Sequence, residues 1–404
     1  NRQATTSHAR CRSLHSLVVA EVALTLVLLV QAGLLVQAFR SLQKMDPGYR
    51  ADNLLVYWIA LPESQYKEKD AWQAFFRDQI EQVRTLPGVT AASAITAPPL
   101  GGHSGSFFTA ENAPARRPDE PDPVVLRRVA WPGYFETLGI TMRAGRTFTD
   151  EDGRTDGARA VIVNETFAQR CWPNQDPIGM RIKEGGPDSK SPWMMVVGVA
   201  RDVKHYGLDR PMIPGVYVPY AQDRRSLMAV VVRTTGDPLD LVSSVRGIVR
   251  RSDPDLPVFD IQTMAGSLHR SLWLRRLYSE LIGVFAGVAL VMALGGLYGV
   301  FSYVVNGRTR EIGIRIAVGA STRTVLWMVL RQALILSAIG IAIGLVGTAI
   351  AVPLMRGILL GVRAADAAIF AFVPVFLIVV VVLASYVPAR RAARIDPMAA
   401  LRSE

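Results

Sequence analysis

Charged side chains gather in one short segment, "NGRTREIGIRIAVGAS" at 306–321, which lies between two long apolar runs. Three arginines and one glutamate equip this segment for recognising charge rather than for breaking bonds. Wound as an α-helix, it places Arg308, Glu311 and Arg315 on one face, with Glu311 and Arg315 paired at i,i+4. Its isoleucines then fall on two other sides, so the segment predicts a short helix with one charged and two apolar sides.

Two interpretations of this segment remain open on the residues alone. Two apolar sides exceed what a single membrane surface requires, which favours an element held between the membrane helices and a partner protein. The alternative is an ordinary basic loop between two spans. Gly319 is placed to end the short helix, and Ser321 or Thr322 can cap the helix that follows.

Motifs for catalysis are missing from the sequence. It contains no GxxxxGK[ST] loop, no HExxH, no CxxC and no GxSxG. The five histidines are scattered without ligand spacing, and the acidic run "DEDGRTDG" at 150–157 lacks the spacing of a calcium loop and predicts a surface turn. We therefore expect no catalytic residues, no metal site and no cofactor of the chain's own.

Two ionisable residues, Glu21 and Arg331, fall inside apolar runs. An ionisable group within a membrane is a functional hypothesis by default. Both residues lie within about two turns of the expected cytoplasmic helix ends, where long side chains reach the interface. The sequence favours structural roles, such as pairing between helices, and leaves a proton or substrate path as the alternative.

Four nearly uncharged runs supply the elements that carry these residues, because a spanning helix needs about 20 apolar residues. Small residues at four-residue spacing in these runs favour close helix packing, within the chain or with a second copy. They are Gly283 and Gly287, Gly295 and Gly299, and Gly340 and Gly344. The predicted organisation is a tail at 1–13, span one at 14–39, an outer domain at 40–276, span two at 277–305, the basic segment at 306–323, span three at 324–355, a short outer loop at 356–366, span four at 367–388 and a tail at 389–404.

The net charge of +11 sets the orientation of these spans. The outer domain holds 31 basic and 28 acidic residues, so the surplus lies beside the spans, and positive-inside topology explains it better than nucleic-acid binding. Both tails and the basic segment should therefore be cytoplasmic. Cys11 and Cys171 then lie on opposite sides of the membrane and should not pair.

The outer domain reads as α+β. Strand-like "NLLVYWIAL" at 53–61 precedes a helical pattern at 69–86 and a second strand, and a similar strand, helix and strand occupy 227–262. This predicts one split, ferredoxin-like subdomain at 50–100 and 225–262, with a second subdomain at 100–222 inserted into it. Within the insert, 101–123 is predicted as a loop, and Asn164 as the N-cap of a helix over "ETFAQRC".

Long stretches of the chain resemble the permeases of MacB/FtsX-type ABC transporters, of the tandem-duplicated kind. The resemblance covers nearly the whole chain and includes "VVAEVALTLVLLVQAGLLVQAFRSL" at 18–42, "GYFETLGITMRAGRTFTDED" at 133–152, "VVGVARDVKHYGLDRPMIPGVYVPYAQ" at 196–222, "RTREIGIRIAVGAS" at 308–321 and "YVPARRAARIDPMAALRSE" at 386–404. It identifies the chain as the C-terminal unit of a longer tandem permease.

The resemblance implies four transmembrane helices, a MacB-like periplasmic core after the first of them, and an FtsX-like permease domain at 277–397. It implies that a separate ATPase subunit binds ATP and couples through the basic segment. The implied coupling residues are Arg308, Thr309, Arg310, Glu311, Ile312, Gly313, Ile314, Arg315 and Gly319. Further implied partners are the bilayer, a second permease copy or homologous half, and a periplasmic or outer-membrane protein, with no nucleic acid. A membrane-anchored ligand sensor without transport is the leading alternative, and a proton-driven carrier is the next.

Overall fold

The computed structural model describes residues 2–114, 124–153, 159–307, 321–354 and 367–392. The chain divides into two compact units. The helical unit comprises 1–44 and 274–404, and the sheet unit comprises Met45–Trp273.

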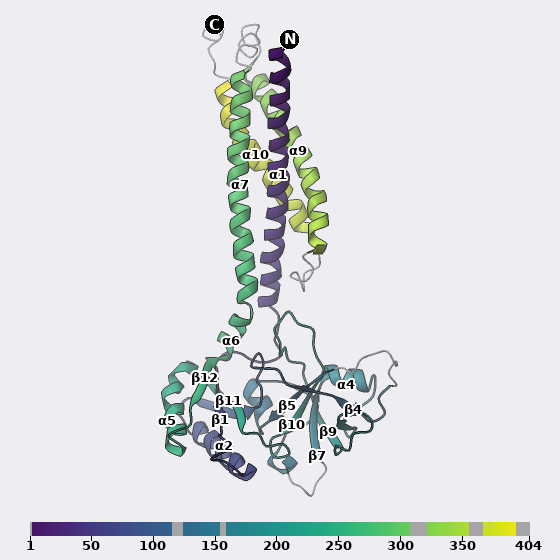
Figure 1. Ribbon diagram of the computed structural model, residues 1–404, viewed down its shortest axis with the longest axis vertical. Coiled ribbons are helices and arrows are strands. Elements are labelled where there is room, and N and C mark those ends of the chain that lie inside the picture. Colours follow the sequence, from purple (N-terminus) through teal and green to yellow (C-terminus); the bar gives the residue numbers. More distant parts are fainter. Residues whose placement is uncertain (1, 115–123, 154–158, 308–320, 355–366, 393–404) are drawn as a thin grey trace. The chain divides into compact units, whose positions relative to one another are not determined.

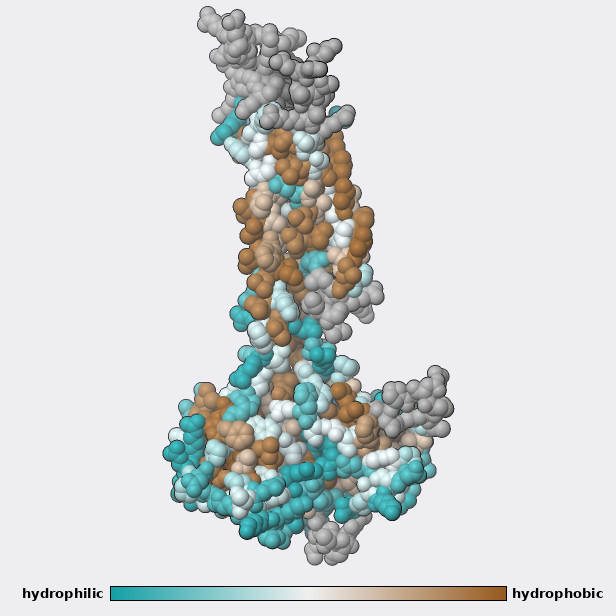
Figure 2. All heavy atoms as spheres, viewed as in Figure 1, coloured by the Kyte–Doolittle hydropathy of each residue, from teal (hydrophilic) through white to brown (hydrophobic). Residues whose placement is uncertain are grey.

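Four long helices, labelled in Figure 1, make up the described part of the helical unit. Within the described residues, four stretches are long and apolar enough to cross a membrane, which confirms the four predicted spans. Apolar side chains cover the middle of these helices in Figure 2. The helices are α1 (Arg2–Gln43), α7 (Trp273–Gly307), α9 (Thr322–Leu354) and α10 (Ala367–Ala392).

Helix α1 supplies most of the core of the helical unit. Val22, Leu26 and Val30 are almost fully buried in a cluster with side chains of α7, α9 and α10. Gly340 and Gly344 let α9 approach α1 closely, because a Cβ at either would come within 2.9 Å of Val22 or of the Ala23 carbonyl oxygen. This pair of predicted small residues therefore packs within the chain.

The small residues of α7 behave differently. A Cβ added at Gly283, Gly287, Gly295 or Gly299 would meet no described atom within 4 Å. Large apolar side chains such as Phe285 are also exposed on this helix. Among the described residues, the expected close packing at these four glycines is therefore not found.

The sheet unit is built on one mixed sheet, in which twelve strands are described. Their order is β12-β1-β11-β2-β5-β10-β7-β9-β8-β4, with β3 beside β5 and β6 beside β9. The strands are β1 (Leu54–Ala60), β2 (Val89–Ile95), β3 (Gly105–Ser106), β4 (Phe108–Ala110), β5 (Val125–Ala130), β6 (Met142–Gly145), β7 (Arg159–Asn164), β8 (Arg181–Glu184), β9 (Met194–Ala200), β10 (Gly215–Pro219), β11 (Leu227–Thr234) and β12 (Val258–Thr263).

The first four strands in that order reproduce the predicted split arrangement. β1 pairs antiparallel with both β11 and β12, and β11 pairs antiparallel with β2. Helices α2 (Lys69–Arg84) and α5 (Val242–Ser252) pack against this part of the sheet and bury Phe76 and Ile248. Alternate residues of β1 enter two different cores, which is why this strand reads as a continuous apolar run.

The inserted strands extend the same sheet rather than forming a separate one. The junction is narrow, because β2 pairs with β5 only at Ile95 and Ala130. β10 pairs parallel with β5, and β7 pairs parallel with β9. The predicted loop at 101–123 was partly wrong: β3 and β4 lie in it, paired with β5 and β8, while 115–123 lies outside the described residues.

Short helices complete the insert and the end of the sheet unit. They are α3 (Tyr134–Leu138), the 3-10 turns at Asp150–Gly153 and Pro238–Leu241, α4 (Glu165–Cys171) and α6 (Met264–Ser271). Asn164 caps α4 as predicted, because its Oδ1 accepts the Phe167 backbone N–H at 2.9 Å. The chain turns at Leu272 between α6 and α7, where the Leu272 N–H donates to the His269 carbonyl oxygen at 3.2 Å.

Candidate functional site

The predicted coupling residues, from Arg308 to Gly319, lie outside the described residues. Their flanks are described: α7 ends at Gly307 and α9 begins at Thr322. The cap predicted for the third span is confirmed at Ser321, whose hydroxyl accepts the Thr324 N–H at 3.3 Å and lies 3.0 Å from the Thr324 hydroxyl.

Glu21 of α1 lies against a glycine of α7. A Cβ added at Gly296 would overlap the Glu21 carboxylate, so the absence of a side chain at Gly296 makes room for it. One turn along α1, the Thr25 hydroxyl donates to the Ala289 carbonyl oxygen at 3.2 Å. Among the described residues, the buried Oε2 of Glu21 has no hydrogen-bond partner.

Arg331 is exposed on α9 and forms no ion pair with Glu21. The polar contact between these helices involves its neighbour instead, since Gln332 Nε2 lies 3.0 Å from His15 Nε2 of α1. The structure therefore separates the two predicted intramembrane residues. Pairing between helices, the structural role that the sequence favours, occurs one residue further along at Gln332.

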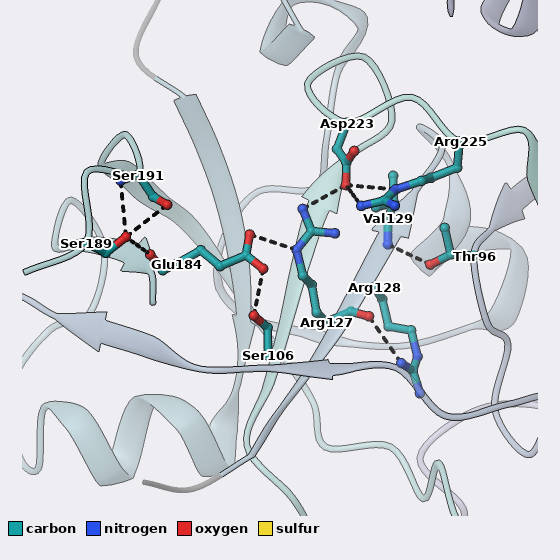
Figure 3. Close-up of polar contacts among 10 residues, drawn as sticks. All are labelled: Thr96, Ser106, Arg127, Arg128, Val129, Glu184, Ser189, Ser191, Asp223 and Arg225. Atoms are coloured by element: carbon teal, nitrogen blue, oxygen red, sulfur yellow. Dashed lines mark hydrogen bonds and ion pairs between the residues drawn. The ribbon is translucent and has the colours of Figure 1, made fainter. Parts of the chain in front are cut away.

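A polar cluster of the sheet unit joins segments that are distant in the sequence (Figure 3). Arg127 of β5 is its centre: Nε lies 3.2 Å from Glu184 of β8, and Nη2 lies 2.7 Å from Asp223, in the turn after β10. Asp223 also accepts from Arg225 at 2.7 Å, and Glu184 accepts from the Ser106 hydroxyl at 2.6 Å. One guanidinium thus ties β3, β8 and the turn to β5.

The electrostatics of this cluster keep its acids ionised. Burial raises the pKa of Asp223, but the hydrogen bonds and charges of Arg225 and Arg127 outweigh burial and leave the pKa below its usual value. No nucleophile or proton acceptor lies free within the cluster as described, and no group of His, Cys, Asp and Glu among the described residues is arranged to hold a metal ion. The cluster can fasten the sheet, and it offers no site for bond chemistry.

Sequence reasoning missed Arg127 and its neighbour Arg128. The available signal was a pair of arginines within the apolar strand "VVLRRVAW", where alternation must point one of them to each face. Arg128 is 1% exposed, so it is a fully buried cation. Its neighbours come from the loop before β3 and could not be located from local sequence.

Comparison with known families identifies both units. The family described as "MacB-like periplasmic core domain" matches residues 17–248, more than half of the chain. The family described as "FtsX-like permease C-terminal" matches residues 283–397, which include the predicted coupling residues.

Curated relatives carry related names. The chain is 28% identical to the pyoverdine export ATP-binding/permease protein PvdT of Pseudomonas putida, over 64% of this chain and 40% of that protein. It is 29% identical to the macrolide export ATP-binding/permease protein MacB of Hahella chejuensis, over 67% and 42%. The chain thus spans about two fifths of the length of these relatives. The ABC transporter permease YknZ of Bacillus subtilis is 24% identical over 82% of this chain and 85% of its own.

Two solved structures are similar at a lower level. The periplasmic region of MacB from Actinobacillus actinomycetemcomitans covers 56% of this chain and 94% of its own, at 12% identity and a TM-score of 0.37. The extracellular domain of YknZ covers 51% and 100%, at 19% identity and a TM-score of 0.33. On the family matches, the chain belongs to the MacB/FtsX-type permeases: membrane proteins with a MacB-like periplasmic core domain and an FtsX-like permease domain.

Proposed function

We propose that this chain is the transmembrane permease of an ABC exporter and that a separate ATPase subunit drives it. The observation that carries the proposal is the presence of both family domains, in order, on one chain with four candidate spans. The names of PvdT and MacB join "ATP-binding" to "permease", whereas this chain spans about 40% of either protein and its sequence has no GxxxxGK[ST] loop. ATP would accordingly be bound by the partner, and the chain would need no cofactor of its own.

The proposed mechanism is mechanical. ATP hydrolysis at the cytoplasmic face would move the segment at 308–319, and the spans would pass that movement to the sheet unit in the periplasm. Cargo need not pass between the helices. The cargo itself and any periplasmic or outer-membrane partner would engage the sheet unit.

A second permease copy or homologous half would pair with this chain through α7. This helix exposes apolar side chains, and the described residues leave open space over its four glycines. Such a surface suits close contact with another helix, or with lipid in its absence. Cross-linking between copies through α7 would be lost on replacing Gly287 and Gly295 by leucine. Unchanged cross-linking would show that α7 faces lipid.

The coupling segment is tested by reversing its charges. The triple variant Arg308→Glu, Arg310→Glu and Arg315→Glu should lower the amount of ATPase that co-purifies with the chain by about tenfold or more, because like charges would then face the partner. The amount of ATPase per permease in a detergent pull-down measures this. Undiminished association would refute the coupling assignment and favour a sensor without transport.

The matched control reverses three arginines on α5 of the sheet unit. Arg246, Arg250 and Arg251 are exposed, so the triple change to glutamate there alters the net charge equally. This control should retain the ATPase. If it lost the partner as well, the effect of the coupling variant would reflect net charge rather than a specific contact.

The proposed orientation places both tails in the cytoplasm and the sheet unit outside. Cys171 cannot report it, because this side chain is buried. In a chain carrying Cys11→Ser, an impermeant maleimide added to intact cells or spheroplasts should label Ser64→Cys in the sheet unit, where Ser64 is exposed. It should not label Ser403→Cys in the C-terminal tail. The reverse labelling pattern would overturn the orientation.

A further inference from the structure

A cavity of about 450 Å³ lies within the sheet unit, in the size range of small-molecule sites. Its walls come from the loop after β2, the loop after β9, the outer strand β12 and helix α6. None of the residues that line it belongs to the Arg127 cluster or to the coupling segment.

The two loops that wall the cavity are fixed in place. The Leu100 N–H donates to the His205 carbonyl oxygen at 2.9 Å, which ties one loop to the other. Buried Arg128 donates to the carbonyl oxygens of Ser104 at 2.7 Å and of Gly102 at 3.3 Å. Leu100 has a φ of +63°, a conformation that a leucine holds only where its surroundings enforce it. The cavity wall is therefore preformed.

A flat aromatic surface forms part of this wall. The rings of His103 and Tyr206 are stacked, with centroids 4.6 Å apart and planes inclined by 17°, and both residues line the cavity. Stacked rings present a broad apolar face against which a planar group can pack.

One acid and one base also line the cavity, and they do not pair with each other. Among the described residues, Arg270 has no ion-pair partner, and Asp260 accepts only from Gln262 Nε2 at 3.2 Å. His205 adds no charge, because burial and the nearby Arg128 cation lower its pKa to about 3. The imidazole Nδ1 is buried without a described partner, whereas Nε2 lies 3.1 Å from the Tyr217 hydroxyl. The cavity thus offers one free carboxylate and one free guanidinium.

We propose that this cavity binds a small zwitterion of the α-amino-acid class with a planar side chain. The ligand ammonium would pair with Asp260 and its carboxylate with Arg270, because charge-assisted hydrogen bonds of this kind are stronger than neutral ones. Its planar group would lie on the His103 and Tyr206 rings. This inference goes beyond the proposed function and does not depend on it, since binding requires neither an ATPase nor transport.

The experiment uses the full chain in nanodiscs and three probes of similar shape. L-phenylalanine carries both charges, phenethylamine lacks the carboxylate and 3-phenylpropionate lacks the ammonium. Isothermal titration calorimetry should give saturable binding of L-phenylalanine at millimolar concentrations or below, and weaker binding of each singly charged probe. The absence of saturable L-phenylalanine binding in this range would overturn the proposal.

Two variants assign the charges. Asp260→Asn should weaken L-phenylalanine and phenethylamine by about tenfold and leave 3-phenylpropionate unchanged. Arg270→Gln should weaken L-phenylalanine and 3-phenylpropionate and leave phenethylamine unchanged. Both side chains are exposed, so neither change should unfold the chain. If the losses do not follow this crossed pattern, the assignment is wrong.

The matched controls remove exposed charges elsewhere in the sheet unit. Asp240→Asn and Arg246→Gln change the net charge by the same amounts away from the cavity. Neither should alter the affinity for any probe. Equal losses in these controls would show a long-range charge effect and would also contradict the proposed site.

Discussion

At the scale of single residues, Arg128 and His205 form a buried polar pair of the sheet unit. Arg128 is 1% exposed and His205 is 5% exposed. Arg128 reaches only carbonyl oxygens, with no described carboxylate to offset its charge. Burying a cation in this way is costly. Since the imidazole lies close to that charge, protonating it would place a second cation in the interior.

This arrangement predicts that acid destabilises the sheet unit through His205. Its folded pKa of about 3 lies below the unfolded value of 6.5, so the unfolded chain binds the extra proton between these values. Stability is complete above pH 6.5 and falls as the pH drops toward 3. Between pH 7 and pH 5 this one group should cost about 2 kcal/mol of unfolding free energy.

Urea unfolding of the detergent-solubilised chain, followed by tryptophan fluorescence, measures this loss. Six of the seven tryptophans lie in the sheet unit, so the signal reports mainly on it. The variant His205→Gln keeps a polar group near the Tyr217 hydroxyl but cannot titrate. Its unfolding free energy should fall by about 2 kcal/mol less over the same pH interval. Equal pH dependence in the two proteins would show that His205 is not the group responsible.

At the scale of elements, local pattern predicted the regular pieces and missed those that depend on distant partners. The strand at 53–61, the helix at 69–86 and the Asn164 cap could be predicted because their signals are periodicity and a cap residue. β3 and β4 hold two and three residues, too few for a pattern. They exist through pairing with β5 and β8, which their own residues cannot reveal.

The candidate site shows the same division. The polar residues inside the spans could be predicted by composition, but not that Gln332, rather than Arg331, meets α1 at His15. The rotation of α9 about its axis decides that contact, and four-residue glycine spacing alone did not fix it. Likewise, the Arg127 cluster joins residues up to 117 positions apart in the chain, from Ser106 to Asp223.

The glycines give a prediction at this scale. Replacing Gly340 or Gly344 by alanine should destabilise the packing of α1 against α9 by about 1–3 kcal/mol each, because the new Cβ meets atoms next to or in the α1 backbone. Gly283→Ala and Gly287→Ala on α7 should change it little, since their surroundings are open. Unfolding in mixed micelles of increasing SDS content measures the difference. Equal effects at all four positions would contradict the described packing.

At the scale of the whole molecule, the account makes the two units parts of one machine. The helical unit carries the proposed ATPase contact, and the sheet unit carries the MacB-like core and the proposed amino-acid cavity. No catalytic group is needed in this chain, because the work would arrive through the segment at 308–319. A sensor would use the same cavity without requiring any response to ATP.

The central claim is that ATP hydrolysis by a partner changes the conformation of the sheet unit. Hydrogen exchange of the permease, reconstituted in nanodiscs with its ATPase, tests it most directly when a vanadate-trapped state is compared with the nucleotide-free state. We predict altered exchange within Met45–Trp273 that disappears in the Arg308→Glu, Arg310→Glu, Arg315→Glu variant. Identical exchange in the two states, or a change that persists in that variant, would contradict the account.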